Sequence, residues 1–370
     1  MSKRNITSIK RGKIAFIVPA YNEEKVIVSS LKYLMNVASR KDIFVVDDGS
    51  KDKSAELARS QKVNVVTIKN VGKANAINTV IKIFDLTKKY DYIMPMDADT
   101  LISPNLPEVV EEIFNNDPDK KIIAVVCKVV GRDTSMTTSY RMWEYEISQV
   151  IYKSAQSIIN SITVNPGCST VYRSEIFDKL AIPARTMTED MDLTFMIHRK
   201  KLGRIVYTPK ATVITQDPKT LKEYIKQINR WYTGFWHCVV KNKVPWGGQI
   251  LDAELVILGL EGVFNGLLSL MLTFLIPFVL IVNPKILFYP FIIDLLFYVL
   301  PTVLYTAISL KTAKIFVYIP TFYFLRILSG LIFLKSFLRV VVGIEEKKSF
   351  VWDTARYTQR EEVSWVNQTS

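Results

Sequence analysis

The sequence predicts an α/β domain built on a mostly parallel sheet, followed by an α-helical transmembrane domain. Up to about Pro245, charged residues and short apolar runs alternate as they do in soluble proteins. Within that part, strand-like runs alternate with helix-like spacings, which is the pattern of parallel βα units. From Leu251 to Gly343, the residues Leu, Ile, Phe, Val and Tyr dominate, as in membrane-spanning helices.

The strands and helices expected in the first part follow one another directly. Each strand is a short apolar run that ends in a turn, and each helix has apolar residues three or four positions apart. In order, they are strand Lys13–Pro19, helix Glu23–Ala38, strand Ile43–Val46, helix Lys53–Gln61, strand Val63–Ile68, helix Ala74–Leu86 and strand Tyr92–Met96. Ligands of such sheets bind at the carboxyl ends of the strands, and polar motifs occupy those positions in this chain.

The net charge of +13 raises the question of a nucleic-acid partner. The Lys and Arg residues are scattered, without zinc spacing, an RRM-like aromatic motif or a basic helical stripe, so we expect no nucleic-acid binding. Anionic lipid together with phosphorylated substrates accounts for the charge equally well. The cysteines Cys127, Cys168 and Cys238 have neither metal-binding nor paired spacing, which favours reduced thiols in the cytosol.

Two polar loops follow the first and second expected strands. They are Pro19-Ala20-Tyr21-Asn22-Glu23 and Asp47-Asp48-Gly49-Ser50. Both should open on the same rim of the sheet, where an aromatic ring beside a carboxylate suits stacking on a base and hydrogen bonding to its edge or to a ribose. The alternative for the second loop is a helix N-cap with a bend glycine.

Asp97-Ala98-Asp99 follows the fourth expected strand. Two carboxylates at positions i and i+2 of a loop can offer oxygen ligands to a hard divalent cation and leave positions for diphosphate oxygens and water. The alternative is a strand end capped by solvated acids. The βα context and the acidic loop upstream favour a metal site.

Three further motifs lie at or within helices. Gly72-Lys73-Ala74 begins a helix, so its free N–H groups and lysine either face a phosphate or simply start the helix. Thr188-Glu189-Asp190 precedes an amphipathic stretch and offers either a general base or a helix cap. Gln227-Ile228-Asn229-Arg230-Trp231 lies on an expected helix, Leu221–Val240. Its arginine suits a leaving diphosphate, and its tryptophan suits either a sugar ring or anchoring at a membrane surface.

In this order, the six motifs resemble those of the family 2 membrane glycosyltransferases, the group of hyaluronan, chitin, cellulose and poly-N-acetylglucosamine synthases. The resemblance covers about Ile14 to Trp231. Asn165–Arg173 is similar to the small-residue segment that lines the acceptor site in that family, and Trp352–Arg356 is similar to a tail motif of the group.

The resemblance implies a GT-A fold, a UDP-sugar donor, a Mg²⁺ or Mn²⁺ ion and inversion at the anomeric carbon. It implies that Asp99 binds the metal and that Asp97 lies on the ribose or metal side. It further implies a general base at Asp190, a diphosphate ligand at Arg230 and an acceptor platform at Trp231. The complete sets are donor-binding residues Ala20, Tyr21, Glu23, Asp48, Lys73, Asp97 and Gln227, and catalytic residues Asp190, Glu189, Arg230 and Trp231.

Three apolar segments of the second part are long enough for a hydrocarbon core, which needs about 20 residues. They are Gly262–Pro284, Ile286–Leu310 and Ile315–Leu334. With a cytosolic first domain, three crossings place the tail outside, whereas its basic residues favour the inside. Either a further crossing lies within Leu251–Leu275, or one apolar segment is re-entrant or interfacial. Asp294 and Arg326, inside the spans, either pair with each other or line a polar passage for sugar.

The expected organisation is a catalytic domain over residues 1–215, interfacial amphipathic helices over 216–250, three or four transmembrane helices over 251–343 and a cytosolic tail over 344–370. We expect a multi-pass protein of the plasma membrane whose catalytic domain is cytosolic.

The leading functional hypothesis is processive synthesis and translocation of a β-linked polysaccharide from a UDP-sugar. The alternative is transfer of one sugar to a lipid-linked acceptor, such as a polyprenyl phosphate or a ceramide-like lipid. A non-catalytic membrane protein that senses nucleotides is less favoured, because all the expected catalytic residues are present.

Overall fold

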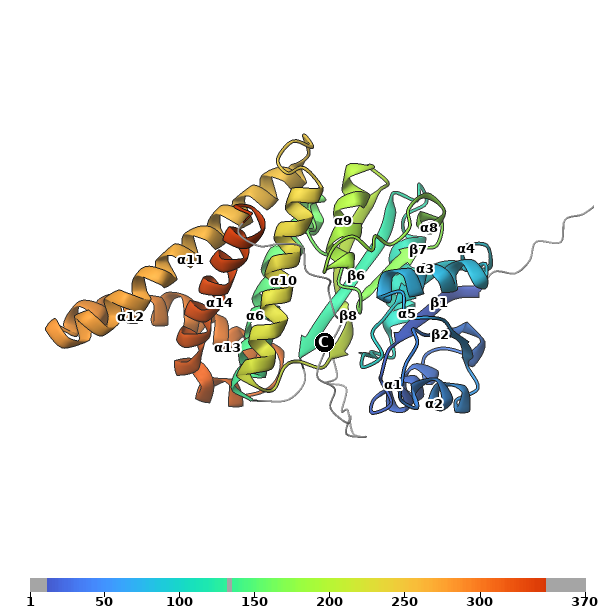
Figure 1. The fold of residues 1–370 in the computed structure, drawn as a ribbon, viewed down its shortest axis with the longest axis horizontal. Coiled ribbons are helices and arrows are strands. Elements are labelled where there is room, and N and C mark those ends of the chain that lie inside the picture. Colours follow the sequence, from blue (N-terminus) through green and yellow to red (C-terminus); the bar gives the residue numbers. More distant parts are fainter. Residues whose placement is uncertain (1–11, 132–134, 344–370) are drawn as a thin grey trace, which may run out of the picture.

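The computed structural model describes residues 12–131 and 135–343, and it consists of a sheet domain followed by long apolar helices (Figure 1). The expected tail, residues 344–370 with the motif Trp352–Arg356, lies outside the described residues. The strands are β1 (Gly12–Ala20), β2 (Ile43–Asp47), β3 (Asn64–Thr67), β4 (Tyr90–Pro95), β5 (Leu101–Ile102), β6 (Ile122–Gly131), β7 (Thr170–Arg173) and β8 (Arg204–Thr215). The helices of this domain are α1 (Ile27–Met35), α2 (Ser54–Ser60), α3 (Lys73–Ile83), α4 (Leu86–Lys89), α5 (Leu106–Asn115), α6 (Met136–Glu146), α7 (Ser154–Ile159), α8 (Ile176–Lys179), α9 (Glu189–Arg199) and α10 (Leu221–Lys241).

The strands form one sheet in the order β3-β2-β1-β4-β7-β6-β8-β5. The pairs β1–β2, β1–β4, β2–β3 and β6–β8 are parallel, whereas β7 is antiparallel to both of its neighbours and β5 is antiparallel to β8. The mostly parallel α/β sheet predicted from the sequence is therefore confirmed. The helix expected over Ala74–Leu86 ends earlier, at Ile83, because Asp85 has left-handed backbone geometry (φ 52°) before α4 begins.

Helices cover both faces of the sheet. One face packs on α1, α2 and α5 and includes Ile14, Phe16 and Val18 of β1. The other face packs on α3, α4, α8 and α9 and includes Ala15 and Ile17 of the same strand. Because both faces are covered, the loops at the strand ends are the accessible part of the sheet.

The helices α6 and α10 lie between the sheet and the apolar helices (Figure 1). A π-helix, Ile147–Lys153, continues α6 into α7. Both α6 and α10 contribute to an aromatic cluster with the last apolar helices, in which Tyr140, Trp143, Tyr224 and Phe322 are all buried. The sheet domain and the apolar region therefore share a core.

The apolar region contains α11 (Ile250–Val282), α12 (Lys285–Asp294), α13 (Leu300–Ser309) and α14 (Ile319–Val340). By length and composition, three stretches could cross a membrane: Ile250–Val282, Lys285–Ser309 and Lys314–Val340. Leu251–Leu275 lies within one continuous helix, α11. The side chains of Asp294 and Arg326 pair at 2.7 Å, which is one of the two arrangements expected from the sequence.

Candidate active site

The loops that follow β1 and β2 are tied together at one rim of the sheet. The two parallel strands stay paired up to Ala20, and beyond it the Asn22 N–H donates to the Ser50 hydroxyl at 3.0 Å. Tyr21 is half-buried and Glu23 is buried in the first of these loops. Both loops therefore open on the same rim, as the sequence predicts.

Asp48 shapes the loop that leads into α3. Its two carboxylate oxygens accept hydrogen bonds from the N–H groups of Val71 at 2.8 Å and Gly72 at 2.9 Å. Burial raises the pKa of the Asp48 carboxyl, and these hydrogen bonds partly oppose that rise. Gly72 has a φ of 84°, a geometry that favours glycine, immediately before Lys73. Asp48 thus fixes the loop before α3 rather than capping α2.

Lys73, Asp97 and Glu189 form a cluster of charged side chains. The Lys73 Nζ lies 2.6 Å from Oδ1 of Asp97 and 3.1 Å from Oε1 of Glu189. Burial lowers the pKa of this lysine, but the carboxylates of Asp97 and Glu189 outweigh burial, and the net shift is upward. The ammonium group therefore stays charged. Three motifs that are far apart in the sequence meet at this one group.

The Cys168 thiol lies among the same charges. Burial raises the pKa of Cys168 well above its usual value, and the carboxylates of Asp97, Asp99 and Asp190 raise it further. Lys73 acts in the opposite direction. Asp99 and Asp190 therefore lie close enough to Lys73 and Asp97 that all four charges affect the Cys168 thiol.

Asp190 is held by the backbone at both carboxylate oxygens. Oδ1 accepts a hydrogen bond from the Met191 N–H at 2.8 Å, and Oδ2 accepts one from the Gly167 N–H at 3.1 Å. A Cβ atom at Gly167 would lie 3.2 Å from the Lys73 Nζ, so a larger residue would disturb the cluster. Desolvation, followed by the charge of Glu189, raises the pKa of Asp190. A fixed carboxylate with a raised pKa is suited to accept a proton.

One face of α9 holds the loop that contains Gly167. Asp190, Thr194 and His198 are spaced four residues apart and so lie on one side of the helix. The Thr194 hydroxyl accepts a hydrogen bond from the Asn165 N–H at 2.9 Å, and Nε2 of His198 lies 3.0 Å from the carbonyl oxygen of Ile162. The small-residue segment predicted to line the acceptor site is thus fastened to the helix of the expected base.

The motif Gln227–Trp231 lies on α10, which packs closely against Thr188. A Cβ atom at Gly234 would lie 2.5 Å from the Thr188 hydroxyl oxygen, so only glycine permits this approach. The Cys238 sulfur lies 3.5 Å from the same hydroxyl. Gln227, Arg230 and Trp231 precede this contact and are half-buried. The helix of the arginine–tryptophan motif is therefore packed against the residue that precedes Glu189.

The structure also contains buried charges that the sequence analysis missed. The Arg141 guanidinium lies 4.4 Å from the centre of the Trp231 ring. Lys153, at the end of the π-helix, donates to the Val164 carbonyl at 2.8 Å, and burial lowers its pKa to about 8. Burial raises the pKa of Asp217, just after β8, to about 6. The sequence offered one signal for such residues, which is a charged residue among apolar ones. It could not show which residues they contact, because those contacts include residues far along the chain.

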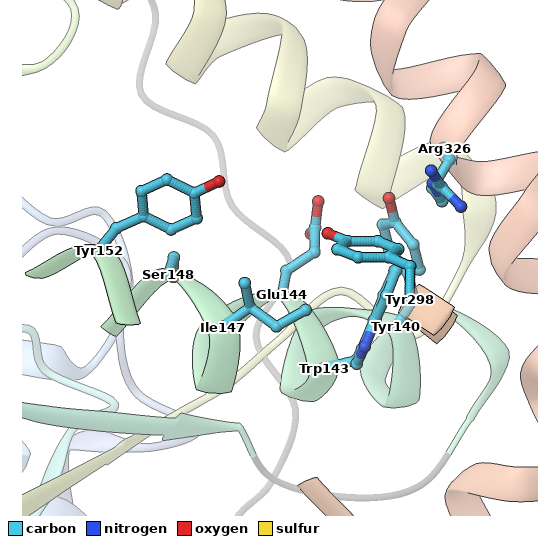
Figure 2. A pocket seen from close by; sticks show the side chains of 8 residues that line it. All are labelled: Tyr140, Trp143, Glu144, Ile147, Ser148, Tyr152, Tyr298 and Arg326. Carbon is cyan, nitrogen blue, oxygen red and sulfur yellow. The ribbon is translucent and has the colours of Figure 1, made fainter. Parts of the chain in front are cut away.

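A pocket of about 220 Å³ lies between α6 and the apolar helices (Figure 2). Figure 2 shows the Glu144 carboxylate between Tyr152 on one side and the aromatic rings near Arg326 on the other. The lining residues are Tyr140, Trp143, Glu144, Ile147, Ser148, Tyr152, Tyr298 and Arg326. The pocket thus combines aromatic walls with a few polar groups.

Asp97 and Asp99 fit a divalent metal ion that is completed by a substrate. Across residues 12–131 and 135–343, no three His, Cys, Asp or Glu side chains are grouped closely enough to hold an ion by themselves. Two carboxylates on one loop nevertheless suit a hard cation whose other ligands are diphosphate oxygens and water. The Lys73 ammonium, 2.6 Å from Asp97, shows that positive charge is accommodated beside this carboxylate.

A mostly parallel sheet with paired acids after β4 and a carboxylate on a neighbouring helix is the arrangement that the resemblance to GT-A glycosyltransferases predicts. The chain belongs to glycosyltransferase family 2: residues 11–234 match the model described as "Glycosyltransferase like family 2". The mannosyltransferase PcManGT from Pyrobaculum calidifontis, solved with GDP-Man and Mn²⁺, has the same fold. Its TM-score is 0.57 at 16% identity, over 90% of this chain and 86% of that one.

Curated relatives include the poly-beta-1,6-N-acetyl-D-glucosamine synthases of two staphylococci. The Staphylococcus aureus (strain COL) protein is 31% identical over 229 residues, which are 60% of this chain and 54% of that protein. The Staphylococcus epidermidis protein is 28% identical over 247 residues, 62% of this chain and 58% of that protein. The chain thus spans about half the length of the curated relatives that it matches.

Proposed function

We propose that this protein transfers a sugar from a nucleotide diphosphate donor to an acceptor at a membrane, with Asp190 as the general base. The observation that supports this most directly is the Asp190 carboxylate, held by two backbone N–H groups beside the Lys73–Asp97–Glu189 cluster. An acceptor hydroxyl that gives its proton to Asp190 attacks the anomeric carbon as the bond to the diphosphate breaks. A single displacement of this kind inverts the anomeric centre.

In this proposal, the donor lies along the carboxyl ends of β1, β2 and β4. Ala20, Tyr21, Glu23 and Asp48 form the nucleoside end, with Tyr21 as the ring that stacks on the base. Lys73, Gln227 and Arg230 then face the diphosphate, where cationic groups stabilise the charge that develops on the leaving group. Asp97 and Asp99 would hold Mg²⁺ or Mn²⁺, which supplies further positive charge to the diphosphate.

The acceptor side of the proposal is formed by Glu189, Asp190 and Trp231. Glu189 is held by Lys73 at 3.1 Å and raises the pKa of the neighbouring Asp190, which strengthens the base. Trp231 offers an apolar ring face of the sort that packs on sugars. The names of the curated relatives support N-acetylglucosamine as the transferred sugar and a β-linked polysaccharide as the product.

The experiment is to incubate membranes containing the protein with radiolabelled UDP-sugars and Mn²⁺, and then to size the product. We expect polymer from UDP-N-acetylglucosamine that linkage-specific hydrolases digest. If the label is found only in a glycolipid that organic solvent extracts, the protein transfers a single sugar to a lipid acceptor and does not polymerise. Absence of both products and of donor hydrolysis, with every UDP-sugar tested, would contradict the proposed function.

A further inference from the structure

Arg141 is a buried cation stacked on aromatic rings beside the proposed acceptor site. It lies on α6 and is 5% exposed. Its guanidinium lies 4.4 Å from the centre of the Trp231 ring and 4.6 Å from the centre of the Tyr145 ring. Its Nε and Nη2 have no hydrogen-bond partner within the described part of the chain. Ring contacts and the ion pair with Glu144, rather than a full set of hydrogen bonds, therefore hold this side chain.

The other contacts of Arg141 connect three separate parts of the fold. Its Nη1 pairs with the Glu144 carboxylate at 2.6 Å, and Glu144 also lines the pocket between α6 and the apolar helices. The Tyr145 hydroxyl donates to Oδ1 of Asp217 at 3.0 Å, which connects the group to the segment between β8 and α10. Asp99 acts electrostatically on Asp217, so the connected group extends towards the metal-binding loop.

We propose that Arg141 is a positioning residue that fixes the Trp231 ring for the acceptor; this inference rests on the proposed function. The guanidinium occupies one side of the indole, so a sugar ring can stack only on the area that remains. Arg141 thereby fixes both the orientation of the platform and the side from which the acceptor approaches. A buried charge is costly unless it is paired, and a merely space-filling role at this position would be met by an apolar side chain.

The test compares Arg141→Lys with a control, Arg199→Lys. Arg199 is partly buried on α9, and its guanidinium donates two hydrogen bonds to the carboxylate of Asp252 in the first turn of α11. Lysine keeps the charge at either position but lacks the planar, forked guanidinium. The control therefore loses guanidinium contacts away from Trp231.

Three quantities are measured on purified protein in detergent: binding of UDP-N-acetylglucosamine with Mn²⁺, donor hydrolysis without acceptor, and transfer as a function of acceptor concentration. We expect Arg141→Lys to keep donor binding and hydrolysis and to raise the acceptor KM by on the order of 10- to 100-fold, the loss typical of a misplaced positioning group. Arg199→Lys should change thermal stability alone. In the Trp231→Phe background, Arg141→Lys should have little additional effect, because its target ring is already altered.

An acceptor KM in Arg141→Lys equal to that of the wild type would overturn the proposal. So would losses that simply add to those of Trp231→Phe. In either case, transfer by the wild-type protein would still support the proposed function. A wild type that shows no transfer would contradict both. If Arg141→Lys does not fold, Tyr145→Phe provides the same test. It keeps the stacked ring, removes only the hydrogen bond to Asp217, and should raise the acceptor KM in the same direction; an unchanged value would contradict the proposal.

Discussion

The Asp190 carboxylate accepts two backbone hydrogen bonds while desolvation and Glu189 raise its pKa. Asp190→Asn keeps the size of the side chain but removes the basic oxygen. We expect unchanged donor affinity, measured by titration calorimetry, and loss of transfer by on the order of 10²–10⁴, the usual contribution of a general base. Asp178→Asn, at an exposed acid of α8, is the control. Normal turnover in Asp190→Asn would rule out this residue as the base.

Asp99 is buried and, in the proposal, holds the metal ion from the loop after β4. Asp99→Ala should weaken donor binding in the presence of Mn²⁺ and remove the difference between titrations with and without Mn²⁺. The reason is that a carboxylate ligand contributes to donor affinity only through the cation. Asp119→Ala, at an acid whose side chain is 67% exposed, should leave that difference intact. A metal dependence that survives in Asp99→Ala would assign the ion to other ligands.

The order of the six motifs and its resemblance to family 2 glycosyltransferases indicated the candidate residues, including Lys73, Asp97 and Asp190. Each motif taken alone left a structural alternative open. The sequence did not indicate that Asp48 accepts hydrogen bonds from the loop before α3. That contact depends on how the chain folds back on itself in three dimensions. Arg141 was missed for the same reason, since its meaning depends on Trp231, 90 residues further along.

At the scale of single elements, α9 joins the proposed base, Asp190, to the loop around Gly167, and Thr194 and His198 bond the same loop. Burial lowers the pKa of His198 below its ordinary value of 6.5. The folded protein therefore takes up a proton at lower pH than the unfolded chain does. The stability that the neutral ring contributes is complete above pH of about 6.5, the pKa of an unperturbed histidine, and is lost as the pH falls below it.

We therefore predict that His198→Gln reduces the fall in melting temperature between pH 7.5 and pH 5.5. Glutamine can still donate to the Ile162 carbonyl but does not titrate, so the comparison isolates the proton. The chain contains only two histidines, and burial also lowers the pKa of the other, His237. His237→Gln should reduce the fall independently, and the double variant should show the smallest fall. Identical pH profiles for wild type and His198→Gln would show that His198 does not carry this dependence.

The elements differ in how well the sequence predicts them. The strands β1 to β4 were predicted because each is an apolar run followed by a helical spacing, and a parallel sheet needs that alternation. The strand β7, Thr170–Arg173, has only four residues, all buried, so it shows neither alternation nor a following long helix. Its place between β4 and β6 is determined by pairing with distant strands rather than by local sequence.

At the scale of the whole molecule, a hydrogen bond to a buried ion pair and a second ion pair join the sheet domain to the apolar helices. Lys128 of β6 lies 2.7 Å from Glu146 of α6, and Ser309 of α13 donates to the same carboxylate at 2.9 Å. Arg199 of α9 pairs with Asp252 in the first turn of α11. Composition predicts the two regions, but it does not predict these contacts, because Ser309 and Asp252 lie far along the chain from Glu146 and Arg199. The first and third apolar helices are therefore bonded directly to helices of the sheet domain.

The placement of α14 bears on how often the chain crosses the membrane. Near its start, Phe322 stacks on Trp143 of α6 with ring centres 5.1 Å apart, and near its end Phe337 lies against Trp236 of α10 at 4.9 Å. Between them, Tyr224 of α10 and Ser329 share a hydrogen bond of 2.8 Å. A crossing helix has its ends on opposite sides of a hydrocarbon core about 30 Å thick. Here both ends contact helices of the sheet domain.

The helix α10 cannot itself lie deep in the hydrocarbon, because Lys222, Lys226 and Lys241 are exposed along it. We therefore predict that α14 lies at the membrane interface and that only α11 and the α12–α13 pair cross. Both ends of α14 then stay on the side of the catalytic domain, which is also the side that the basic residues of the tail favour.

Single cysteines at exposed positions test this arrangement with a membrane-impermeant maleimide on intact cells. Lys285→Cys, at the start of α12, should react from outside. Lys311→Cys, before α14, and Val342→Cys, after it, should react only when the membrane is opened. The native cysteines Cys127, Cys168 and Cys238 are buried, so the wild type should give little background. Labelling of Val342→Cys on intact cells would mean that α14 crosses, and its contacts with α6 and α10 would then require those helices to enter the membrane with it.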